Sequence, residues 1–381
     1  MIKYLFSIVA TALLLGACHA AGDATQSTRV DDAGLPFTVQ EVARFNEPWA
    51  MTFLPDGRLL VTEKRGRLKL LEIGGDANNV SGVPEVDYGG QGGLSDVVLH
   101  PDFANNQTLY LSYAEAGNAG KRGAAVARAK LTLDEAGGGE LSDVEVVWRQ
   151  VPKVTGEGHY GHRLAFGPDG YLWISSGERQ KFDPAQDMQA NLGKILRLND
   201  DGSVPADNPF AEQGGVTAEI WSLGHRNPLG IAFDGKGQLW NIEMGPRGGD
   251  ELNRVERGAN YGYPIVSEGN HYDGRRIPDH DTQPRFNAPA IAWTPVISPA
   301  SFIIYDGEAF PDWQGDGLIA GLSAQGLVRV ELDGKTAHEV ARYEFGERLR
   351  EVEQGPDGYV WILEDDRDDS DGQLLKLSPR S

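Results

Sequence analysis

Short stretches of alternating apolar and polar residues recur along this chain, and each follows a tight turn. The turn reads Pro-Asp-Gly or a close variant, as in FGPDGYLWISSGE, which starts at Phe166. An Asp-Gly turn before such alternation is a strong signal for a β-hairpin with one buried face. Long helical patterns are scarce, so the chain is predicted to be all-β. Six units of this kind occur, and the other five start at Phe53, Leu99, Ala232, Trp313 and Glu353.

One such unit is a small antiparallel sheet that cannot bury both of its faces alone. Regular recurrence therefore predicts stacked sheets, and radial closure into a β-propeller removes their unpaired edges. Six turns predict a six-bladed β-propeller. A pair of β-sandwich domains is the structural alternative, but two domains should be joined by a linker, and none is visible in the folded part.

The first residues are typical of an exported protein. Lys3 gives a positive start, and the apolar run over residues 4–15 is too short to span a bilayer permanently. The run ends in Leu-Gly-Ala-Cys, with Cys18 last, which resembles the lipobox of bacterial lipoproteins. In that motif the cysteine is lipidated and becomes the new N-terminus. An incidental cysteine in an ordinary signal peptide is the alternative.

These features predict three parts of the chain. Residues 1–17 are expected to be a lipoprotein signal peptide, residues 18–35 a flexible tether, and residues 36–380 the β-propeller domain. A lipidated Cys18 would be the only contact with a membrane. His19 stands where an aspartate would retain a lipoprotein in the inner membrane. The expected location is therefore the periplasmic side, on the outer membrane.

The formal net charge is −21 at pH 7, and the charges are spread along the chain. Such a surface repels phosphate backbones, so nucleic acid is not an expected partner. The dense acidic run over residues 364–371 is expected to be a solvated turn. Cys18 is the only cysteine, so no internal disulfide can form.

Chemistry is expected on loops between strands, because loops converge at one mouth of a propeller's channel. The loop TGEGHYGHRL places His159 and His162 among glycines. Histidine is readily poised as a base near neutral pH, and glycines let a backbone approach a flat ligand. Glu178 stands at the far end of the following strand region, so the sequence leaves open whether it reaches His159. Turn capping or packing is the alternative for either histidine.

Arginines from distant segments could gather at the same mouth. Arg226 lies in LGHRNPLGIAF, and Arg348 and Arg350 lie in ERLREVEQGPDGY. The last two are two residues apart, so a strand would point both to one face. Converging guanidinium groups would bind carboxylates or stabilise an oxyanion. The alternative is an exposed face whose arginines pair with Glu351 or Glu353.

The loop GPRGGDE offers oxygen ligands of the kind that calcium prefers. It supplies the carbonyls of Gly245 and Pro246 and the carboxylates of Asp250 and Glu251. Backbone ligands leave almost no sequence signature, so the motif is weak. No His/Cys cluster suggests zinc, no Walker loop suggests a nucleotide, and no GxSxG elbow suggests a serine hydrolase.

Taken together, these segments resemble the glucose/sorbosone dehydrogenase family of soluble quinoprotein sugar dehydrogenases, most closely its bacterial aldose sugar dehydrogenase branch. They run from about Gln91 to Tyr359, across nearly all of the folded part. The family is a six-bladed β-propeller, in agreement with the repeat pattern. The matching pieces, in chain order, are GQGGLSDVVLHPDF, GHYGHRLAFGPDGYLWISSGE, LGHRNPLGIAF, GPRGGDELNRVERGANYGYP and RLREVEQGPDGY.

The resemblance implies pyrroloquinoline quinone (PQQ) as cofactor, held with a calcium ion (Ca2+) at the channel mouth. His159 matches the family's catalytic base, and Glu178 matches the carboxylate that orients it. The positions that match cofactor contacts are Gln91, Arg226, Asn227, Arg348 and Arg350. Those that match calcium ligands are Gly245 and Pro246 at the active site, and Glu251 and Tyr261 at a second, structural site.

The implied reaction is the oxidation of an aldose sugar. His159 would remove the proton of the anomeric hydroxyl, and hydride would pass to PQQ while Arg226 stabilises the charge on the quinone oxygen. Calcium would polarise the quinone carbonyl. The products would be a lactone and reduced cofactor, which needs an external electron acceptor. On this hypothesis His159, Arg226, Arg348 and Gln91 face one cavity.

Three positions depart from the family pattern. Relatives place a lysine on the cofactor where this chain has Ser323 or Gln325, a polar residue where it has Leu229, and usually glycine where it has His162. Two other functions therefore stay open: a calcium-dependent propeller lactonase, and a non-catalytic ligand-binding propeller that has lost PQQ. The arginines argue against the lactonase, since a neutral lactone needs no such cluster.

Overall fold

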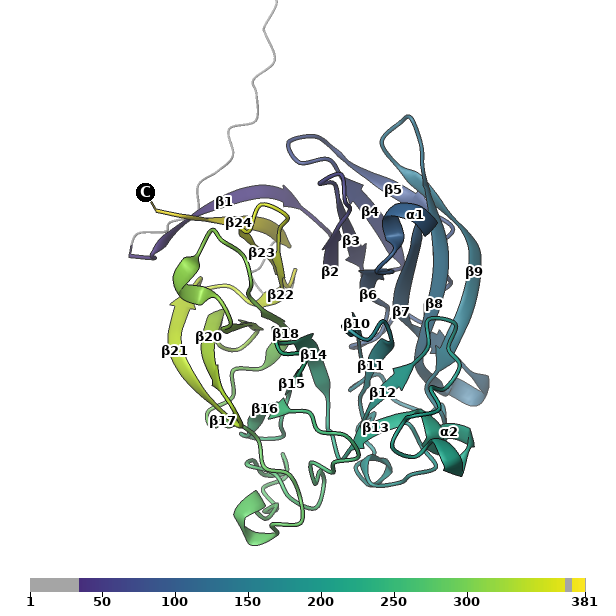
Figure 1. Ribbon diagram of the computed structural model, residues 1–381, viewed down its shortest axis with the longest axis vertical. Helices are drawn as coiled ribbons and strands as arrows, with labels where there is room; N and C mark the ends of the chain where they lie inside the picture. Colours follow the sequence, from purple (N-terminus) through teal and green to yellow (C-terminus); the bar gives the residue numbers. More distant parts are fainter. Residues whose placement is uncertain (1–33, 367–371, 381) are drawn as a thin grey trace, which may run out of the picture.

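The computed structural model describes residues 34–366 and 372–380. Within them the chain forms six four-stranded units around a central axis (Figure 1). The prediction of an all-β, six-bladed β-propeller is confirmed. Cys18 and His19, on which the predicted lipid anchor depends, lie outside the described residues.

Each of the first five blades is an antiparallel meander whose first strand faces the axis. Blade 1 contains β2 (Pro48–Phe53), β3 (Leu59–Glu63), β4 (Arg67–Leu71) and β5 (Ala77–Ser81). Blade 2 contains β6 (Leu94–Leu99), β7 (Thr108–Ala116), β8 (Arg122–Leu133) and β9 (Gly139–Arg149). Short parallel pairing of β5 with β9 joins these two blades into one eight-stranded sheet. Blade 3 contains β10 (Gly161–Phe166), β11 (Leu172–Ser176), β12 (Lys194–Leu198) and β13 (Ile220–Leu223).

The remaining blades follow in chain order. Blade 4 contains β14 (Pro228–Phe233), β15 (Leu239–Glu243), β16 (Asp250–Arg254) and β17 (Ile291–Trp293). Blade 5 contains β18 (Pro299–Ile304), β19 (Gly317–Gly321), β20 (Gly326–Asp333) and β21 (Thr336–Glu344). Blade 6 contains β22 (Leu349–Gln354), β23 (Val360–Glu364), β24 (Gln373–Pro379) and β1 (Phe37–Arg44).

Helical structure is limited to short connections. In the described part of the chain, none of the helices is long and apolar enough to cross a membrane. The α-helices are α1 (Phe103–Asn106) and α2 (Gly215–Glu219). Single 3-10 turns lie at Asn118–Gly120, Asp183–Ala185, Ala211–Gln213, His280–Thr282 and Pro311–Trp313.

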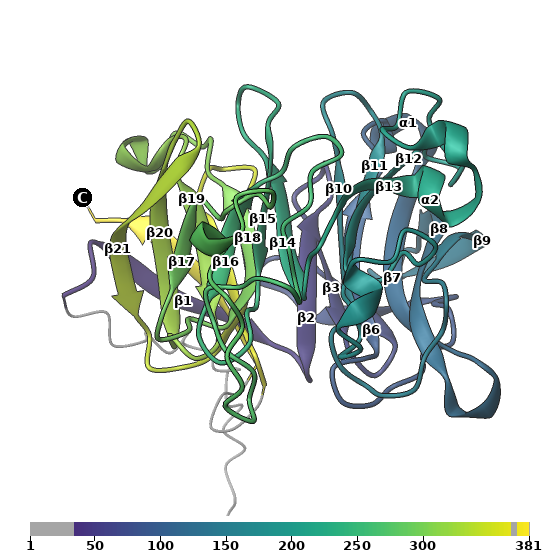
Figure 2. The same ribbon diagram turned by 90° about the horizontal axis from the view of Figure 1, so that it is seen from below.

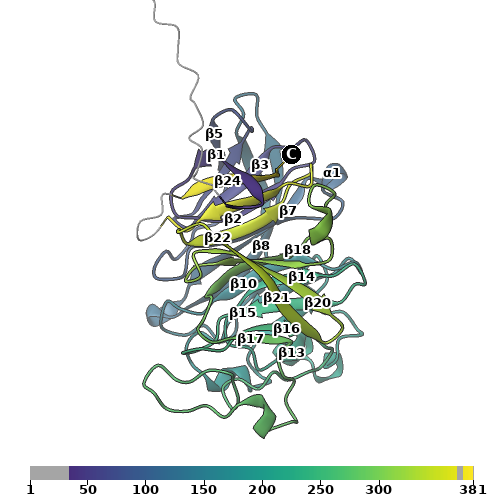
Figure 3. The same cartoon turned by 90° about the vertical axis from the view of Figure 1, so that its left-hand side faces the viewer.

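A strand from the beginning of the domain closes the ring. β1 pairs antiparallel with β24, with Phe37 opposite Pro379, so blade 6 combines both ends of the domain (Figure 3). Each inner strand contacts the inner strand of the next blade, and β22 contacts β2. Radial closure of this kind removes the long unpaired edges that single sheets would expose.

The predicted Asp-Gly turns join the inner strand of a blade to its second strand. Between β10 and β11, Gly170 has φ +81°, a conformation that favours glycine, and its N–H donates to the Gly167 carbonyl at 2.9 Å. The second strands are buried between blades, as for all five residues of β11. Inner strands run along the axis (Figure 2). Each hairpin therefore returns the chain to the mouth at which its inner strand began.

Candidate functional site

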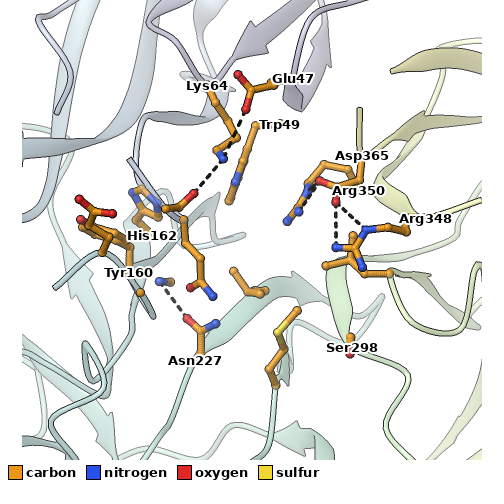
Figure 4. Close-up of a pocket in the computed structure, with 18 of the residues that line it drawn as sticks. Glu47, Trp49, Lys64, Tyr160, His162, Asn227, Ser298, Arg348, Arg350 and Asp365 are labelled. Carbon is orange, nitrogen blue, oxygen red and sulfur yellow. Dashed lines mark hydrogen bonds and ion pairs between the residues drawn. The ribbon is translucent and has the colours of Figure 1, made fainter. Parts of the chain in front are cut away.

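A cavity of about 640 Å³ opens at the end of the axis where the inner strands begin (Figure 4). Trp49 of β2, His162 of β10 and Leu229 of β14 form part of its wall. The predicted cofactor-contacting residues Gln91, Asn227, Arg348 and Arg350 also line it. Blades that are far apart in the sequence therefore contribute to one hollow.

His159 and Glu178 are in direct contact. The distance from His159 Nδ1 to Glu178 Oε1 is 2.5 Å. The β10–β11 hairpin explains this, because its turn brings Glu178 back to the mouth that His159 precedes. Glu178 is distant from His159 along the chain, but the hairpin brings the two residues side by side. The second oxygen of Glu178 accepts the backbone N–H groups of Lys181 and Phe182 at 2.5 and 2.7 Å, which fixes the carboxylate.

This pair has the chemistry of a positioned base. A carboxylate that accepts a hydrogen bond requires the proton on His159 Nδ1, which leaves the lone pair on Nε2. Burial lowers the pKa of His159; the hydrogen bond that it donates to Glu178 opposes this shift, and the charge of Arg226 adds to it. Burial would raise the pKa of Glu178, but the hydrogen bonds that it accepts, first that from His159, outweigh burial and lower it. A neutral imidazole thus lies beside an ionised carboxylate.

Gln91 holds the histidine loop as well as lining the cavity. Its Oε1 accepts the backbone N–H of His159 at 2.7 Å, and its own N–H donates to the Glu157 carbonyl at 2.8 Å. His159 has φ +50°, a left-handed conformation that such bonds help to maintain. This positioning role was not visible in the sequence, because the two segments are 68 residues apart.

Arg348 and Arg350 share one carboxylate, that of Asp365. Arg348 Nε donates to Oδ2 at 2.9 Å and Arg350 Nε to Oδ1 at 2.8 Å. Arg350 lies in β22 and Arg348 precedes that strand, so the two arginines do not act from one strand face, although both bind the same carboxylate. The alternative of pairing with Glu351 or Glu353 is wrong for Glu351. Glu351 instead pairs with Arg163 at 2.5 Å.

The sequence pattern did not indicate that Asp365 is a partner of the two arginines. It lies in the acidic run that was expected to be a solvated turn, yet Glu364 and Asp365 expose only 3% and 7% of their surface. Burial would raise the pKa of Asp365, but the charges of Arg350 and Arg348 outweigh it and hold the pKa below its usual value. The expectation of solvation is therefore wrong for these two residues.

Arg226 lies beside the large cavity, against the loop that follows β15. Its backbone N–H donates to Glu243 Oε2 at 2.6 Å, and its carbonyl accepts the Glu178 N–H at 2.9 Å. Neither Arg226 nor His159 belongs to the wall of the 640 Å³ cavity, although the neighbours of His159 do. The four residues expected to face one cavity are thus divided: Gln91 and Arg348 line it, and the other two adjoin it.

His162 and Leu229, two of the three positions that differ from the family pattern, line the same cavity. Burial, followed by the charges of Arg163 and Arg179, lowers the pKa of His162 to about 3. Its ring therefore stays neutral, with Nε2 2.9 Å from Ser95 Oγ. The apolar side chain of Leu229 lines the same cavity.

The donors around the cavity suit a planar polyanion. Lys64, Arg348 and Arg350 line it. Among the described residues, Arg226 Nε and Asn227 Nδ2 are buried donors without a hydrogen-bond partner. An unsatisfied buried donor costs stability, so such atoms point to a bound group or a rearrangement on binding. PQQ, with its three carboxylates, fits this set of residues.

The first predicted calcium site offers suitable oxygen ligands, but one of them is already engaged. The Gly245 carbonyl accepts a hydrogen bond from Arg226 Nη1 at 2.6 Å. Gly245 and Pro246 line a small cavity of about 10 Å³ together with Glu251. Carbonyl and carboxylate oxygens are the ligands that calcium prefers. A cation that used both carbonyls would therefore need the Arg226 guanidinium to move away from Gly245.

The second predicted calcium site does not fit. The Tyr261 hydroxyl donates to the Arg254 carbonyl at 2.5 Å, and the Tyr261 carbonyl accepts from His280 Nε2 at 3.0 Å. Both oxygens of Tyr261 are therefore engaged by protein groups, and we place no cation between it and Glu251. In residues 34–366 and 372–380, no three or more His, Cys, Asp or Glu side chains form a cluster suited to a metal.

Comparisons with known proteins agree with this geometry. A model of the family "Glucose / Sorbosone dehydrogenase" matches residues 45–376. Aldose sugar dehydrogenase YliI of Escherichia coli is 41% identical over 347 residues, which cover 89% of this chain and 91% of that protein. Quinoprotein glucose dehydrogenase B of Acinetobacter calcoaceticus is 28% identical over 415 residues, covering 85% and 84% of the two chains.

Solved structures are similar as well. The apo-form of the soluble aldose sugar dehydrogenase from Escherichia coli has a TM-score of 0.83 at 38% identity and covers 90% of this chain and 100% of that one. The PQQ-bound aldose sugar dehydrogenase from Streptomyces coelicolor has a TM-score of 0.73 at 29% identity, covering 90% and 98%.

Proposed function

The chain belongs to the glucose/sorbosone dehydrogenase family, and from this premise we propose that it is a PQQ-dependent aldose sugar dehydrogenase. In this proposal it oxidises the anomeric hydroxyl of an aldose to a lactone and passes the electrons to an external acceptor. The observation that carries the proposal is the 2.5 Å contact of His159 with Glu178 beside a cavity lined by arginines. The PQQ-bound relative from Streptomyces coelicolor supports the choice of cofactor.

Each residue in the proposal has a task that follows from its contacts. His159 takes the hydroxyl proton on Nε2, and Glu178 holds the ring and stabilises the imidazolium that forms. Arg348 and Arg350 bind cofactor carboxylates, which replace or supplement Asp365. Arg226 places positive charge beside His159, where negative charge on a bound quinone oxygen would need it.

PQQ, when bound, would supply the acceptor for the hydride that leaves the anomeric carbon. Gly245 and Pro246 would hold the calcium ion that accompanies it. Asn227 and Gln91 would orient the bound ring system from the wall of the cavity. In each case the protein contributes position and charge.

Export and lipidation at Cys18 are part of the same proposal. An enzyme of this kind on the periplasmic side of the outer membrane would oxidise sugars before their uptake. The tether from residue 18 to residue 35 would then separate the propeller from the membrane.

Reconstitution tests the proposal. The chain without residues 1–18 would be mixed with PQQ and Ca2+, and dye reduction would be followed with a panel of aldoses. Dye reduction that requires both additions is the expected result. Lactone hydrolysis without PQQ would favour the lactonase instead, and PQQ binding without dye reduction by any aldose would favour a non-catalytic propeller.

A further inference from the structure

The turn that follows Glu178 has an unusual backbone conformation. Arg179, Gln180 and Phe182 have φ of +62°, +57° and +63°, in the left-handed region that residues other than glycine rarely adopt. This turn places the Phe182 N–H 2.7 Å from Glu178 Oε2. Residues in such conformations persist only where neighbouring groups hold them. Arg179 holds the first end of the turn, because its Nε donates to the Gly158 carbonyl at 2.8 Å, and the other end needs a support of its own.

Lys194, the first residue of β12, provides a buried ammonium at that other end. Its side chain is 0% exposed, and Nζ donates to the carbonyls of Pro184, Ala185 and Leu192 at 2.8, 3.1 and 2.8 Å. Three acceptors use all three donors of an ammonium, whereas a neutral amine would have only two. Burial lowers the pKa of Lys194 to about 7, and the charge of Asp187 opposes this shift. Burying a charge is costly, so a lysine at this position indicates a role for it.

Ala185 connects the ammonium to Glu178. The Ala185 N–H donates to the Phe182 carbonyl at 3.0 Å, and the Ala185 carbonyl accepts both Lys194 Nζ and the Gly224 N–H, the latter at 3.0 Å. Phe182 in turn donates its own N–H to Glu178. A continuous set of hydrogen bonds therefore runs from the Lys194 ammonium to the carboxylate that contacts the base.

We propose that Lys194 is a positioning residue: its ammonium fixes the turn whose N–H groups orient the Glu178 carboxylate toward His159. This inference depends on the proposed function, because it concerns the same catalytic pair. Lys194 does not line the large cavity, so it is assigned no contact with the sugar or the cofactor. Without its ammonium the three carbonyls lose their common donor and the strained turn can relax. Glu178 would then hold the imidazole less firmly, and the rate would fall while binding is spared.

A double-mutant cycle tests this assignment. Dye reduction with PQQ, Ca2+ and an aldose substrate would give kcat for wild type, K194M, E178Q and the double variant, below the Lys194 pKa of about 7. K194M should lower kcat by about 10-fold and leave KM and the affinity for PQQ, measured by equilibrium dialysis, close to wild type. In the E178Q background K194M should change kcat by less than about twofold, because the group through which it acts is gone.

The pH profile gives a readout that a general loss of stability would not move. The bond to Glu178 raises the pKa of His159, so the kcat/KM midpoint of K194M should lie at lower pH than that of wild type. Leu196 is fully buried in the same strand, so L196A is the matched control. L196A should lower the thermal unfolding temperature and keep the wild-type kcat and pH midpoint.

Two further variants separate charge from folding. K194R keeps the charge and the donors and should recover most of the rate. K194Q, which keeps two N–H donors, takes the place of K194M in the cycle if K194M does not fold. Additive losses of kcat in the cycle, an unchanged kcat without the ammonium, or an equal loss in L196A would overturn the inference. Failure of the wild type itself to reduce dye with any aldose would instead overturn the proposed function.

Discussion

His159 and Glu178 are 19 residues apart in the chain and form a hydrogen bond of 2.5 Å between Nδ1 and Oε1. The β10–β11 hairpin brings them together, and the backbone N–H of Glu178 donates to the Arg226 carbonyl at 2.9 Å. The base, its orienting carboxylate and Arg226 thus form one connected unit. Its rigidity comes from the ends of buried strands, which is the arrangement expected of a precisely held site.

Replacing His159 should remove catalysis and spare cofactor binding. H159A should lower kcat by about 10²- to 10⁴-fold, the usual contribution of a general base. PQQ affinity should remain close to that of wild type, since the arginines are untouched. Steady-state dye reduction and equilibrium dialysis would measure the two quantities. His338 is exposed on β21, so H338A serves as the matched control. Equal losses of kcat in the two variants would contradict the assignment.

The activity should depend on pH through His159. Its pKa lies below the usual 6.5, so kcat/KM should be level at neutral pH and fall as the pH drops through the lowered pKa. Glu178 works to raise that pKa. E178Q should therefore move the midpoint to still lower pH and reduce the plateau. A wild-type midpoint above 6.5, or a shift to higher pH in E178Q, would be incompatible with this view.

Gln91 should act on the rate through the histidine loop. Its Oε1 accepts the His159 N–H at 2.7 Å, so Q91A should misplace the imidazole and lower kcat by about 10-fold or more. Single-turnover reduction of bound PQQ, measured by absorbance, would report this step directly. A loss confined to PQQ affinity, with an unchanged single-turnover rate, would show that Gln91 serves only as a cofactor contact.

Asp365 should stabilise the cofactor-free protein. D365N leaves two guanidinium groups without their shared carboxylate and should lower the free energy of unfolding by about 1–3 kcal/mol, as measured by urea denaturation. Because its pKa is depressed, this contribution is present above the usual value of 3.8 and is lost as pH falls through the lower folded value. The surface pair of Arg128 with Glu145 is the control, and E145Q should change stability by less than about 1 kcal/mol. Equal effects would argue against a special role for Asp365.

Cys18 should decide where the protein is found in the cell. C18A should abolish incorporation of labelled palmitate and move the protein from the membrane fraction to the soluble periplasmic fraction. Cell fractionation with wild type as reference would test this. Unchanged membrane association of C18A would show that the N-terminal residues anchor the protein without lipidation.

The sequence by itself determined the fold and the types of residue available for chemistry. Asp-Gly turns before period-2 alternation specify hairpins through local backbone preferences, and those preferences act within a few residues. Six repeats then leave a closed ring as the way to bury every blade. The segments around His159, Arg226 and Arg348 are candidates from sequence because they hold more glycine, histidine and arginine than the loops of a propeller require.

Only the tertiary structure decided which of these residues meet. Contact between Glu178 and His159 depends on the direction in which the β10–β11 hairpin returns. Arg348 and Arg350 both bind Asp365, which could not be distinguished in the sequence from the other acidic residues of its run. The engagement of Tyr261 by His280 and the arrival of Lys64 from blade 1 likewise involve segments far apart in the chain. Such contacts are set by the packing of blades around an axis, and local sequence carries no information about distances across that axis.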